Sequence, residues 1–481
     1  MWKRKIIIPR FTIQFSRIVA LSFCALSSSF SAEKQKDVHR QEKPLPVLKT
    51  EVTKFQPGKT YDLAKLIDLG LANNPYTRAA WQNAVAAAAA TGEARAPYYP
   101  KATVHVIGGA DQGYTMAANG PNNYQRVQVV PVIALEYLLV DFGRRNADLE
   151  RTLHALDAAN LTYDRQMQRT VFAIQRAYYH HNAALSQEKA AAANLELART
   201  IVAMVSERMK SGLATQPEVL FSTKVLTQAQ LDSEMALRNV KTTLGQLRTA
   251  AGIEANAPLT VLPLTIPSSY TGLQEKLDTL IDSGLKNRPD LASRIADLRA
   301  REAATRRAKA DFLPQVRLQG SYENDTFSYH GHDGQTSGTY SENRNGFGAF
   351  AVVDWDLFDG FERVQRVKRR LAEEEGSRAE IEVERLNTIL DVWTSYYDMT
   401  TAKRRVDFAI SLLASSQEAF NATEASYNAG LATITEFVTA QNDLATARYE
   451  RANADADYLT AVASLTLSMG TNSSQAAANK N

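Results

Sequence analysis

Two very long stretches without helix-breaking residues limit the folds that this chain can adopt. The first stretch, Arg144–Ser211, contains no glycine or proline. The second stretch, Phe361–Ala429, contains Gly376 as its only glycine or proline. At 1.5 Å per residue, a helix over either stretch reaches about 100 Å. Because no compact domain houses such a helix, we expect both stretches to form coiled coils.

Each stretch is expected to form one arm of a helical hairpin. Gly212 and Gly430 follow the two stretches, and glycine is the usual residue just past a helix end. A second helix is expected after each glycine, over Leu213–Ala251 and Leu431–Met469, so that both hairpins have the tip sequence Gly-Leu-Ala-Thr. Positions that are mostly apolar recur at alternating spacings of four and three, which predicts a left-handed supercoil. These positions are Met167, Val171, Ile174, Tyr178, His181 and Leu185 in the first stretch, Val406, Ile410, Leu413, Gln417, Phe420, Glu424 and Tyr427 in the second, and Leu237, Val240, Leu244 and Leu247 in a return helix.

The whole chain is an internal duplication. The pattern Leu-x-x-Leu-Ile-Asp-x-Gly-Leu-x-Asn-x-Pro begins at Leu63 and returns at Leu277. The tip sequence that begins at Gly212 returns at Gly430, in nearly the same register. We therefore predict a first repeat over 59–252, a linker over 253–272 and a second repeat over 273–470. Each repeat is expected to contain a helical stretch, two strands around a loop, and the long hairpin.

The segments between the helices alternate apolar and polar residues with the period of two that is typical of strands. Strands of about ten residues that end in aromatic residues have the length and the aromatic girdles of outer-membrane barrel strands. The Gly/Asn-rich segments 108–124 and 323–345 are expected to be long loops, and Trp355 is placed on the lipid face near the rim. Because a closed membrane barrel needs at least about eight strands, a chain with four strands must close its barrel in a symmetric oligomer within the outer-membrane lipid. The alternating segments are Val127–Leu139, Gln315–Tyr322 and Phe347–Leu357.

The N-terminal segment 1–32 has the layout of a secretory signal peptide. Five basic residues and no acid flank the apolar core Ile18–Leu26, and the small-residue run Ser27–Ala32 follows. Cys24 is the only cysteine, and Phe23 stands before it where lipoprotein signals carry a small residue, so lipidation is not expected. Residues 33–58 are a polar lead-in, and residues 471–481 are a polar tail.

Charge and composition exclude two broad classes. Without residues 1–32 the chain has 50 basic and 52 acidic residues, a net charge of −2, which does not support a nucleic-acid partner. The chain has no apolar run long enough for an ordinary transmembrane helix, which needs about 18 residues or more.

The sequence carries no motif for catalysis or cofactor binding. Gly58–Thr60 resembles the end of a phosphate loop, but Thr53 occupies the position of the earlier glycine that such a loop requires. His180 and His181 are adjacent and point about 100° apart on a helix, which suits a shared metal poorly. We therefore expect no enzyme, no cofactor and no resident metal, and the energy for any transport must come from partner proteins.

The duplicated motifs resemble those of the TolC-type outer membrane efflux proteins, which are the outer membrane channels of tripartite pumps. The resemblance covers about residues 58–470 and recurs in both halves. It implies an α+β membrane protein: a homotrimeric 12-stranded β-barrel in the cell outer membrane, with four strands per chain, continued by a long periplasmic α-helical coiled-coil tunnel. The motifs are Asn74-Pro75 and Arg288-Pro289, Tyr98-Tyr99-Pro100 and Phe312-Leu313-Pro314, the corners Leu139–Gly143 and Leu357–Gly360, and the two tips.

The resemblance also implies partners and a function. Such proteins work with a periplasmic adaptor protein and an inner-membrane pump of RND or ABC type. The implied function is a passive exit channel of a tripartite efflux or type I secretion system, which opens at its periplasmic tip on engagement with adaptor and pump. The alternative is a periplasmic coiled-coil adaptor or scaffold without a channel, which would not need membrane-length amphipathic strands. The expected adaptor contacts are Gly212, Leu213, Ala214, Thr215, Gly430, Leu431, Ala432 and Thr433.

The resemblance further assigns the periplasmic aperture. Glu436, six residues after Gly430, holds the position of an aperture acid, and Glu218 is its equivalent in the first repeat. Tyr427 lies where a tyrosine can bond the acid of the first hairpin. The alternative for both glutamates is a role as first-turn acids that the helix dipole favours.

Two departures from the family pattern affect the gate. Ala432 replaces an arginine, and Thr439 replaces a second acid. Closure of the periplasmic aperture is therefore expected to depend more on hydrogen bonds and apolar packing than on salt bridges, with Phe437 as a candidate plug. Asp443 lies seven residues after Glu436, so the same helical face can present it as a second acidic ring.

Overall fold

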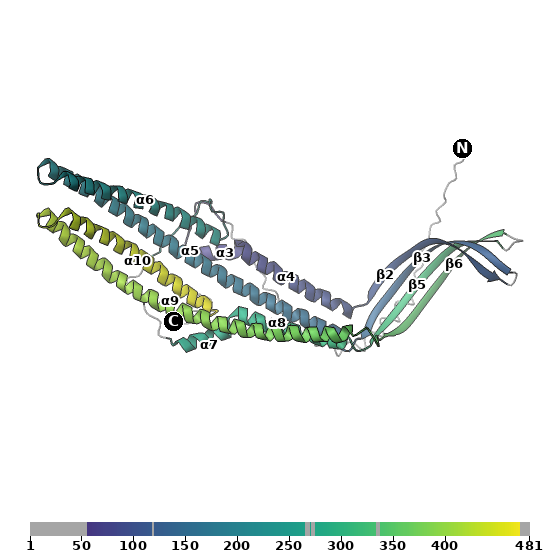
Figure 1. Cartoon of the computed structure of the whole chain (residues 1–481). Helices are drawn as coiled ribbons and strands as arrows, with labels where there is room; N and C mark the ends of the chain where they lie inside the picture. The colour runs from purple at the N-terminus through teal and green to yellow at the C-terminus, as the bar shows by residue number, and fades with distance from the viewer. Residues whose placement is uncertain (1–54, 118–119, 265–269, 271–274, 333–336, 472–481) are drawn as a thin grey trace, which may run out of the picture. The chain divides into compact units, whose positions relative to one another are not determined.

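The computed structural model describes residues 55–117, 120–264, 270, 275–332 and 337–471. The expected signal peptide (1–32), most of the lead-in and the tail after residue 471 lie outside the described residues, as does part of the expected linker. Two sets of helices and strands follow one another in the order that the duplication predicts (Figure 1). The helices are α3 (Leu63–Asn73), α4 (Pro75–Arg95), the short 3-10 helix η1 (Ala96–Tyr98), α5 (Arg144–Lys210), α6 (Gln216–Ala250), α7 (Leu277–Asn287), α8 (Pro289–Ala310), α9 (Glu362–Asn428) and α10 (Ile434–Ser468).

The two long helices expected from the sequence are present. Helices α5 and α9 each have 67 residues, and each forms a hairpin with the helix that follows it (Figure 1). The expected heptad positions are buried or half-buried, for example Ile174, Tyr178, Val406 and Phe420. Helices α6 and α10 begin three residues later than expected, because the threonine of each tip adopts an extended conformation and caps the helix.

Each shorter helical stretch is broken in two before a proline. Asn74 and Arg288 adopt extended backbone conformations, which favours a helix end before Pro75 and Pro289. The C-terminal end of the return helix packs against this break in each repeat. A Cβ atom on Gly470 would lie 2.8 Å from the backbone nitrogen and Cα of Arg288, so only glycine fits there.

The strands form one antiparallel sheet in the order β2-β3-β5-β6, and they are longer than the sequence analysis predicts. Segments 108–124 and 323–345 are therefore largely strand, and their prediction as long loops is wrong. The reason is that the ladder is held by backbone hydrogen bonds, which glycine and asparagine make as well as other residues do. The strands are β2 (Lys101–Ala117), β3 (Gly120–Val140), β5 (Gln315–His332) and β6 (Ser337–Asp354), and a separate parallel pair joins β1 (Thr60–Tyr61) to β4 (Thr260–Val261).

All the charged residues of the sheet lie on one of its two faces. The register pairs Glu136 with Gln319 and Asp325 with Arg344, and all the charged residues of the four strands fall on this face, which we call the charged face. The opposite face, the uncharged face, carries the row Ile133, Tyr322 and Phe347. The charged residues are Lys101, Asp111, Arg126, Glu136, Arg317, Glu323, Asp325, Glu342, Arg344 and Asp354.

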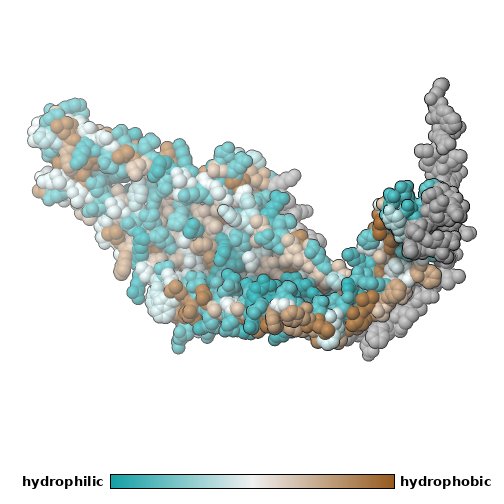
Figure 2. Space-filling model, turned by 45° about the vertical axis from the view of Figure 1, so that its right-hand side comes forward, coloured by the Kyte–Doolittle hydropathy of each residue, from teal (hydrophilic) through white to brown (hydrophobic). Residues whose placement is uncertain are grey.

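The part of the sheet next to the helices has its own ion pairs and aromatic side chains. On the charged face, Arg317 binds Glu136 at 2.7 Å and Asp354 at 2.5 Å. Trp355 lies just past β6, is exposed, and donates from Nε1 to the carbonyl oxygen of Phe312 at 3.1 Å. Figure 2 shows hydrophobic residues gathered on this helix-proximal part of the strands.

The corners between strand and helix are fixed by aspartate caps. Asp141 accepts a hydrogen bond from the backbone nitrogen of Arg145 at 2.7 Å, and the Arg145 guanidinium returns to the carbonyl oxygen of Leu138 at 2.7 Å. Asp359 accepts from the backbone nitrogen of Arg363 at 3.1 Å in the second repeat. Helix α5 is thus tied to the end of β3, and the start of α9 is joined to the segment before β5, because Arg363 donates to the carbonyl oxygen of Asp311 at 3.3 Å. Among the described helices, none is long and apolar enough to cross a membrane.

Candidate functional site

The two hairpin tips present an apolar residue at their ends. Gly212 and Gly430 have positive φ values of 70° and 75°, which glycine adopts without strain. The next backbone nitrogens, of Leu213 and Leu431, donate to carbonyl oxygens five residues earlier at 2.8 Å, which completes a helix-ending motif. The leucine side chains are left 70% and 84% exposed, so they are available for contacts with another protein.

The tip glutamates begin the return helices. The carboxylate of Glu436 accepts from the backbone nitrogen of Thr433 at 2.7 Å and from its hydroxyl at 3.0 Å. Glu218 makes the same bonds to Thr215, at 2.6 and 3.1 Å. The backbone hydrogen bond lowers the pKa of Glu436 below its ordinary value. The geometry therefore gives both glutamates a capping role, which agrees with the alternative interpretation of the sequence.

Phe437 is buried in the tip and cannot act as a plug in this conformation. Its side chain is 1% exposed and stacks on Phe420 and Tyr427 with ring centroids 5.7 and 5.3 Å apart. These rings belong to an apolar cluster shared by the two hairpins. Phe437 is therefore not the exposed residue that a plug requires, because Ile434, Phe437 and Val438 form the buried stripe of α10, which faces α5 and α6.

Tyr427 is held by an arginine that the sequence analysis does not identify. The guanidinium of Arg208, at the end of α5, lies 4.9 Å from the centre of the Tyr427 ring. It also donates to the Tyr427 carbonyl oxygen at 3.2 Å. Among the contacts of the described residues, the expected bond from Tyr427 to Glu218 does not occur. Burial raises the pKa of the Tyr427 phenol, with the positive charge of Arg208 opposing.

Two amide pairs join the hairpins further from the tip. Gln187 of α5 donates to Asn453 of α10 at 2.6 Å, and Gln441 of α10 donates to Asn194 of α5 at 2.9 Å. Gln441 is 1% exposed, so breaking its bond would leave a buried amide without a partner. Helices α5 and α10 are therefore linked by polar contacts along their length as well as by the apolar cluster.

Asp443 shares a surface with Glu436, as the spacing of seven residues predicts. Both carboxylates line a shallow groove between α9 and α10, on which the other side chains are small or carry hydroxyl groups. Within the described part of the chain, no basic residue lines this groove. The remaining lining residues are Ser415, Ser416, Ala419, Thr423, Thr435, Thr439 and Ala440.

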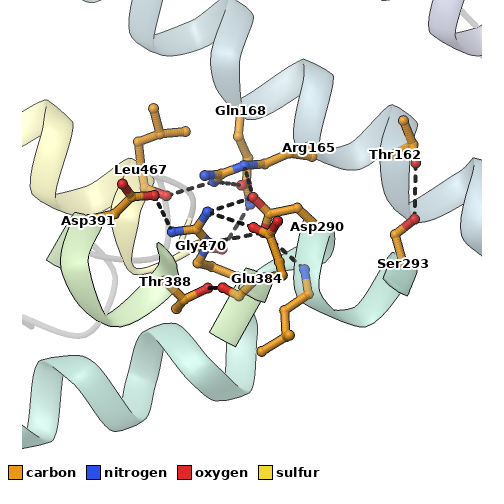
Figure 3. A network of polar contacts seen from close by, with 12 residues as sticks. Thr162, Arg165, Gln168, Asp290, Ser293, Glu384, Thr388, Asp391, Leu467 and Gly470 are labelled. Atoms are coloured by element: carbon orange, nitrogen blue, oxygen red, sulfur yellow. Dashed lines mark hydrogen bonds and ion pairs between the residues drawn. The ribbon is translucent and has the colours of Figure 1, made fainter. Parts of the chain in front are cut away.

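A buried ionic network lies where the second hairpin meets the break between α7 and α8 (Figure 3). Arg288 binds Asp290 at 2.7 Å and Asp391 at 2.7 Å, and Arg165 binds Asp290 at 2.9 Å. Arg165 also donates to the carbonyl oxygen of Leu467 at 2.8 Å, so the C-terminal end of α10 is joined to α5.

Burial and pairing shift the ionisation of this network. Burial lowers the pKa of Arg165 to about 10. Burial opposes ionisation of Asp290, but hydrogen bonds from Arg288 and the charge of Arg165 outweigh it and hold the pKa of Asp290 below its ordinary value. In the first repeat, Asn74 occupies the position of Arg288 and donates to the carbonyl oxygen of Ala250 at 3.0 Å. In both repeats, the residue before the proline therefore lies at the break between two helices. Asn74 is held there by a hydrogen bond to the backbone, whereas Arg288 is held by ion pairs.

Together, these features define a class of protein. A duplicated chain whose long helical hairpins run into strands of membrane-spanning length, with one face free of charge, has the architecture of a tunnel-forming outer-membrane protein. The family model described as outer membrane efflux protein matches residues 66–253 and 280–471, and the chain belongs to this family. Members of this family are outer-membrane channels of tripartite efflux or secretion systems, rather than enzymes, and the protein is located in the outer membrane.

Individual relatives agree over most of the chain. Protein CyaE of Bordetella pertussis is 27% identical over 391 residues, which cover 80% of each chain. Outer membrane protein OprJ of Pseudomonas aeruginosa is 25% identical over 390 residues, which cover 79% of this chain and 78% of OprJ.

Solved structures show the same fold. The outer-membrane channel OprN matches with a TM-score of 0.71 at 19% identity, over 85% of this chain and 90% of OprN. The CmeC outer membrane channel of Campylobacter jejuni matches with a TM-score of 0.69 at 16% identity, over 87% of this chain and 89% of CmeC.

Proposed function

We propose that three copies of this chain form a 12-stranded barrel that continues into a periplasmic helical tunnel, and that this assembly is a passive exit channel. The separation of charge in the sheet carries the proposal. A charged face lines water, and a face without charge for the whole length of four strands suits lipid, so the sheet is one third of a barrel wall. The sheet order leaves β2 and β6 as edges, which need partner strands from other copies.

An exposed apolar stripe on α9 supports assembly through the helices. Its residues recur at spacings of three and four, the same heptad pattern as the buried stripe, but they are about half exposed in the single chain. The stripe is large enough to require cover, and a neighbouring copy in the trimer would supply it. The residues are Val383, Leu386, Leu390, Trp393 and Tyr397.

The tips are the proposed point of contact with a periplasmic adaptor, and through it with an inner-membrane pump of RND or ABC type. Exposed Leu213 and Leu431 offer apolar contacts, and the Gly-Leu-Ala-Thr turns offer compact surfaces on which an adaptor hairpin can dock. Since the chain has no energy-converting motif, the pump drives export and the channel provides the passage.

The proposal also includes the domain organisation expected from the sequence: a signal peptide at 1–32 and the predicted boundaries of the two repeats.

The proposed gate is the contact between the two hairpins of one chain. Movement of α9 and α10 away from α5 and α6 would separate Arg208 from Tyr427 and would break the amide pairs of Gln187 and Gln441. In a trimer, three copies of Glu436 and Asp443 on one groove surface would form acidic rings that attract cations. Capping and lining the aperture are compatible roles for Glu436, because its carboxylate is exposed.

The test is to express the full chain, extract it from the outer membrane in detergent, and record from planar bilayers. The proposal predicts a complex three times the mass of one chain that dissociates only on heating, and discrete single-channel currents. A monomer, or a complex that is released without detergent and does not conduct, would instead support the periplasmic adaptor or scaffold without a channel.

A further inference from the structure

We infer that the helix-distal half of the uncharged face on β5 and β6 binds the saccharide headgroups of the outer-leaflet glycolipid. The inference rests on the proposed barrel, which makes the uncharged face the outside of the wall. Because the helices continue on the periplasmic side, the helix-distal half of the strands lies toward the cell exterior.

On β5 and β6, the residues of the uncharged face change from apolar to polar along the strands. Near the helices it is apolar: Val316, Leu318 and Tyr322 of β5 lie beside Ala351 and Phe347 of β6. Further out, the residues of these two strands whose side chains are described carry only amides, hydroxyls and the imidazole of His330 on this face. The apolar residues cover roughly 20–25 Å along the strand at 3.3 Å per residue, close to the height of a hydrocarbon-facing band. The outer residues are Asn324, Thr326, Ser328 and His330 on β5, and Asn345, Asn343, Ser341 and Thr339 on β6.

This outer half lies beyond the hydrocarbon and still carries no charge. A surface in free water has about a quarter to a third charged residues. Glu323, Asp325, Glu342 and Arg344 occupy the intervening positions on the same stretch of strand, and all of them point to the charged face. The chain therefore places charge freely at this height on the inside and excludes it on the outside, which bulk water would not require.

The hydrogen-bonding groups of the outer half are arranged as a ladder. Asn324 donates to Asn343 at 2.8 Å and also to Asn345, and Asn343 donates to Thr326 at 3.2 Å. The hydroxyl of Tyr322 donates to Asn345 at 3.4 Å, which joins the ladder to the aromatic row below it. Asn343 and Asn345 are exposed, and each amide has more donor and acceptor positions than these contacts use.

This chemistry selects a saccharide over the other groups of an outer leaflet. Sugar hydroxyls exchange hydrogen bonds with amides and hydroxyls, and sugar rings lie against exposed aromatic rings such as Phe347, which is 92% exposed. Phosphate groups would call for arginine or lysine, and the described strands carry neither on this face. Acyl chains favour apolar residues, which on β5 and β6 lie nearer the helices on this face.

The experiment measures glycolipid binding to detergent-solubilised trimers that have first been shown to conduct in bilayers. The probes are lipopolysaccharide with its core sugars, lipid A without core sugars, and the free core oligosaccharide. The variant is Asn324→Ala/Asn343→Ala/Asn345→Ala, and the matched control is Asp325→Ala/Arg344→Ala, one residue along the same strands on the charged face.

We expect the wild-type trimer to bind lipopolysaccharide about tenfold more tightly than lipid A, and the triple variant to lose most of that difference while the control keeps it. Equal binding of the two lipids, no binding of either, or an equal loss in the control would overturn the inference. Binding of the free oligosaccharide as tightly as the glycolipid would also overturn it, because the ligand would then be a soluble saccharide. Failure to trimerise or conduct would instead count against the proposed channel.

Discussion

Removal of the Arg208 side chain should destabilise the closed channel. Arg208 lies over the ring of Tyr427 and binds its carbonyl oxygen, so the Arg208→Ala change removes two contacts between the hairpins at once. A cation–π contact at a partly exposed site contributes about 0.5–1 kcal/mol. A hydrogen bond from a charged group contributes about 1.5–3 kcal/mol. Because Arg208 is half-exposed, we take the lower values, which add to about 2 kcal/mol per chain.

If opening of the channel separates Arg208 from Tyr427, the loss of about 2 kcal/mol shifts the equilibrium between closed and open hairpins about 30-fold toward the open state in each chain. Single-channel recording without adaptor should therefore show a resting open probability raised at least about tenfold. Arg199→Ala is the matched control, because Arg199 lies on the same helix and pairs with Glu196 within α5 at 3.2 Å. Unchanged resting conductance in Arg208→Ala, or an equal rise in Arg199→Ala, would refute this account of the gate.

Three further changes test other parts of the structure. Glu436→Gln should weaken cation selectivity and divalent-ion block in bilayers with little change in conductance, since glutamine retains the helix cap; unchanged selectivity would leave Glu436 a capping residue alone. Gly470→Ala should lower the temperature of trimer dissociation through about 2–4 kcal/mol of backbone strain and overlap with Arg288, whereas Gly376→Ala, which meets open space, should not lower it. Leu135→Arg should reduce outer-membrane insertion at a cost of roughly 2–4 kcal/mol on the lipid face, whereas Ala134→Arg on the charged face should insert normally; equal yields would show that the two faces are assigned wrongly.

The helical part of the fold could be predicted from the sequence because its signals are local. Heptads and the absence of glycine and proline define α5 and α9, and Gly212 and Gly430 stand just past the last helical residues, Lys210 and Asn428. The strands are harder to delimit from the sequence, because beyond Tyr322 and Phe347 the uncharged face becomes polar and the apolar alternation disappears, while the backbone ladder continues.

The site could be predicted only where it depends on neighbours in the chain. The spacing of Glu436 and Asp443 places both on one groove, as expected. Arg208 and Tyr427 lie on different hairpins, far apart in the sequence, and no local pattern pairs them. The burial of Phe437 cannot be predicted from the sequence for the same reason, because the partners that bury it include Ile201 and Val205 of the other hairpin.

Cysteine accessibility in the barrel wall tests the central claim most directly. Leu318 and Gln319 are adjacent on β5 and point to opposite faces, and Cys24 is the only native cysteine. In a Cys24→Ser background, single cysteines at 318 and 319 are treated with a charged, water-soluble thiol reagent during bilayer recording. The account predicts that the reagent reduces conductance through Gln319→Cys and leaves Leu318→Cys unaffected, while a lipid-soluble reagent labels only Leu318→Cys. Block through Leu318→Cys, or no block through Gln319→Cys, would contradict a channel lined by the charged face.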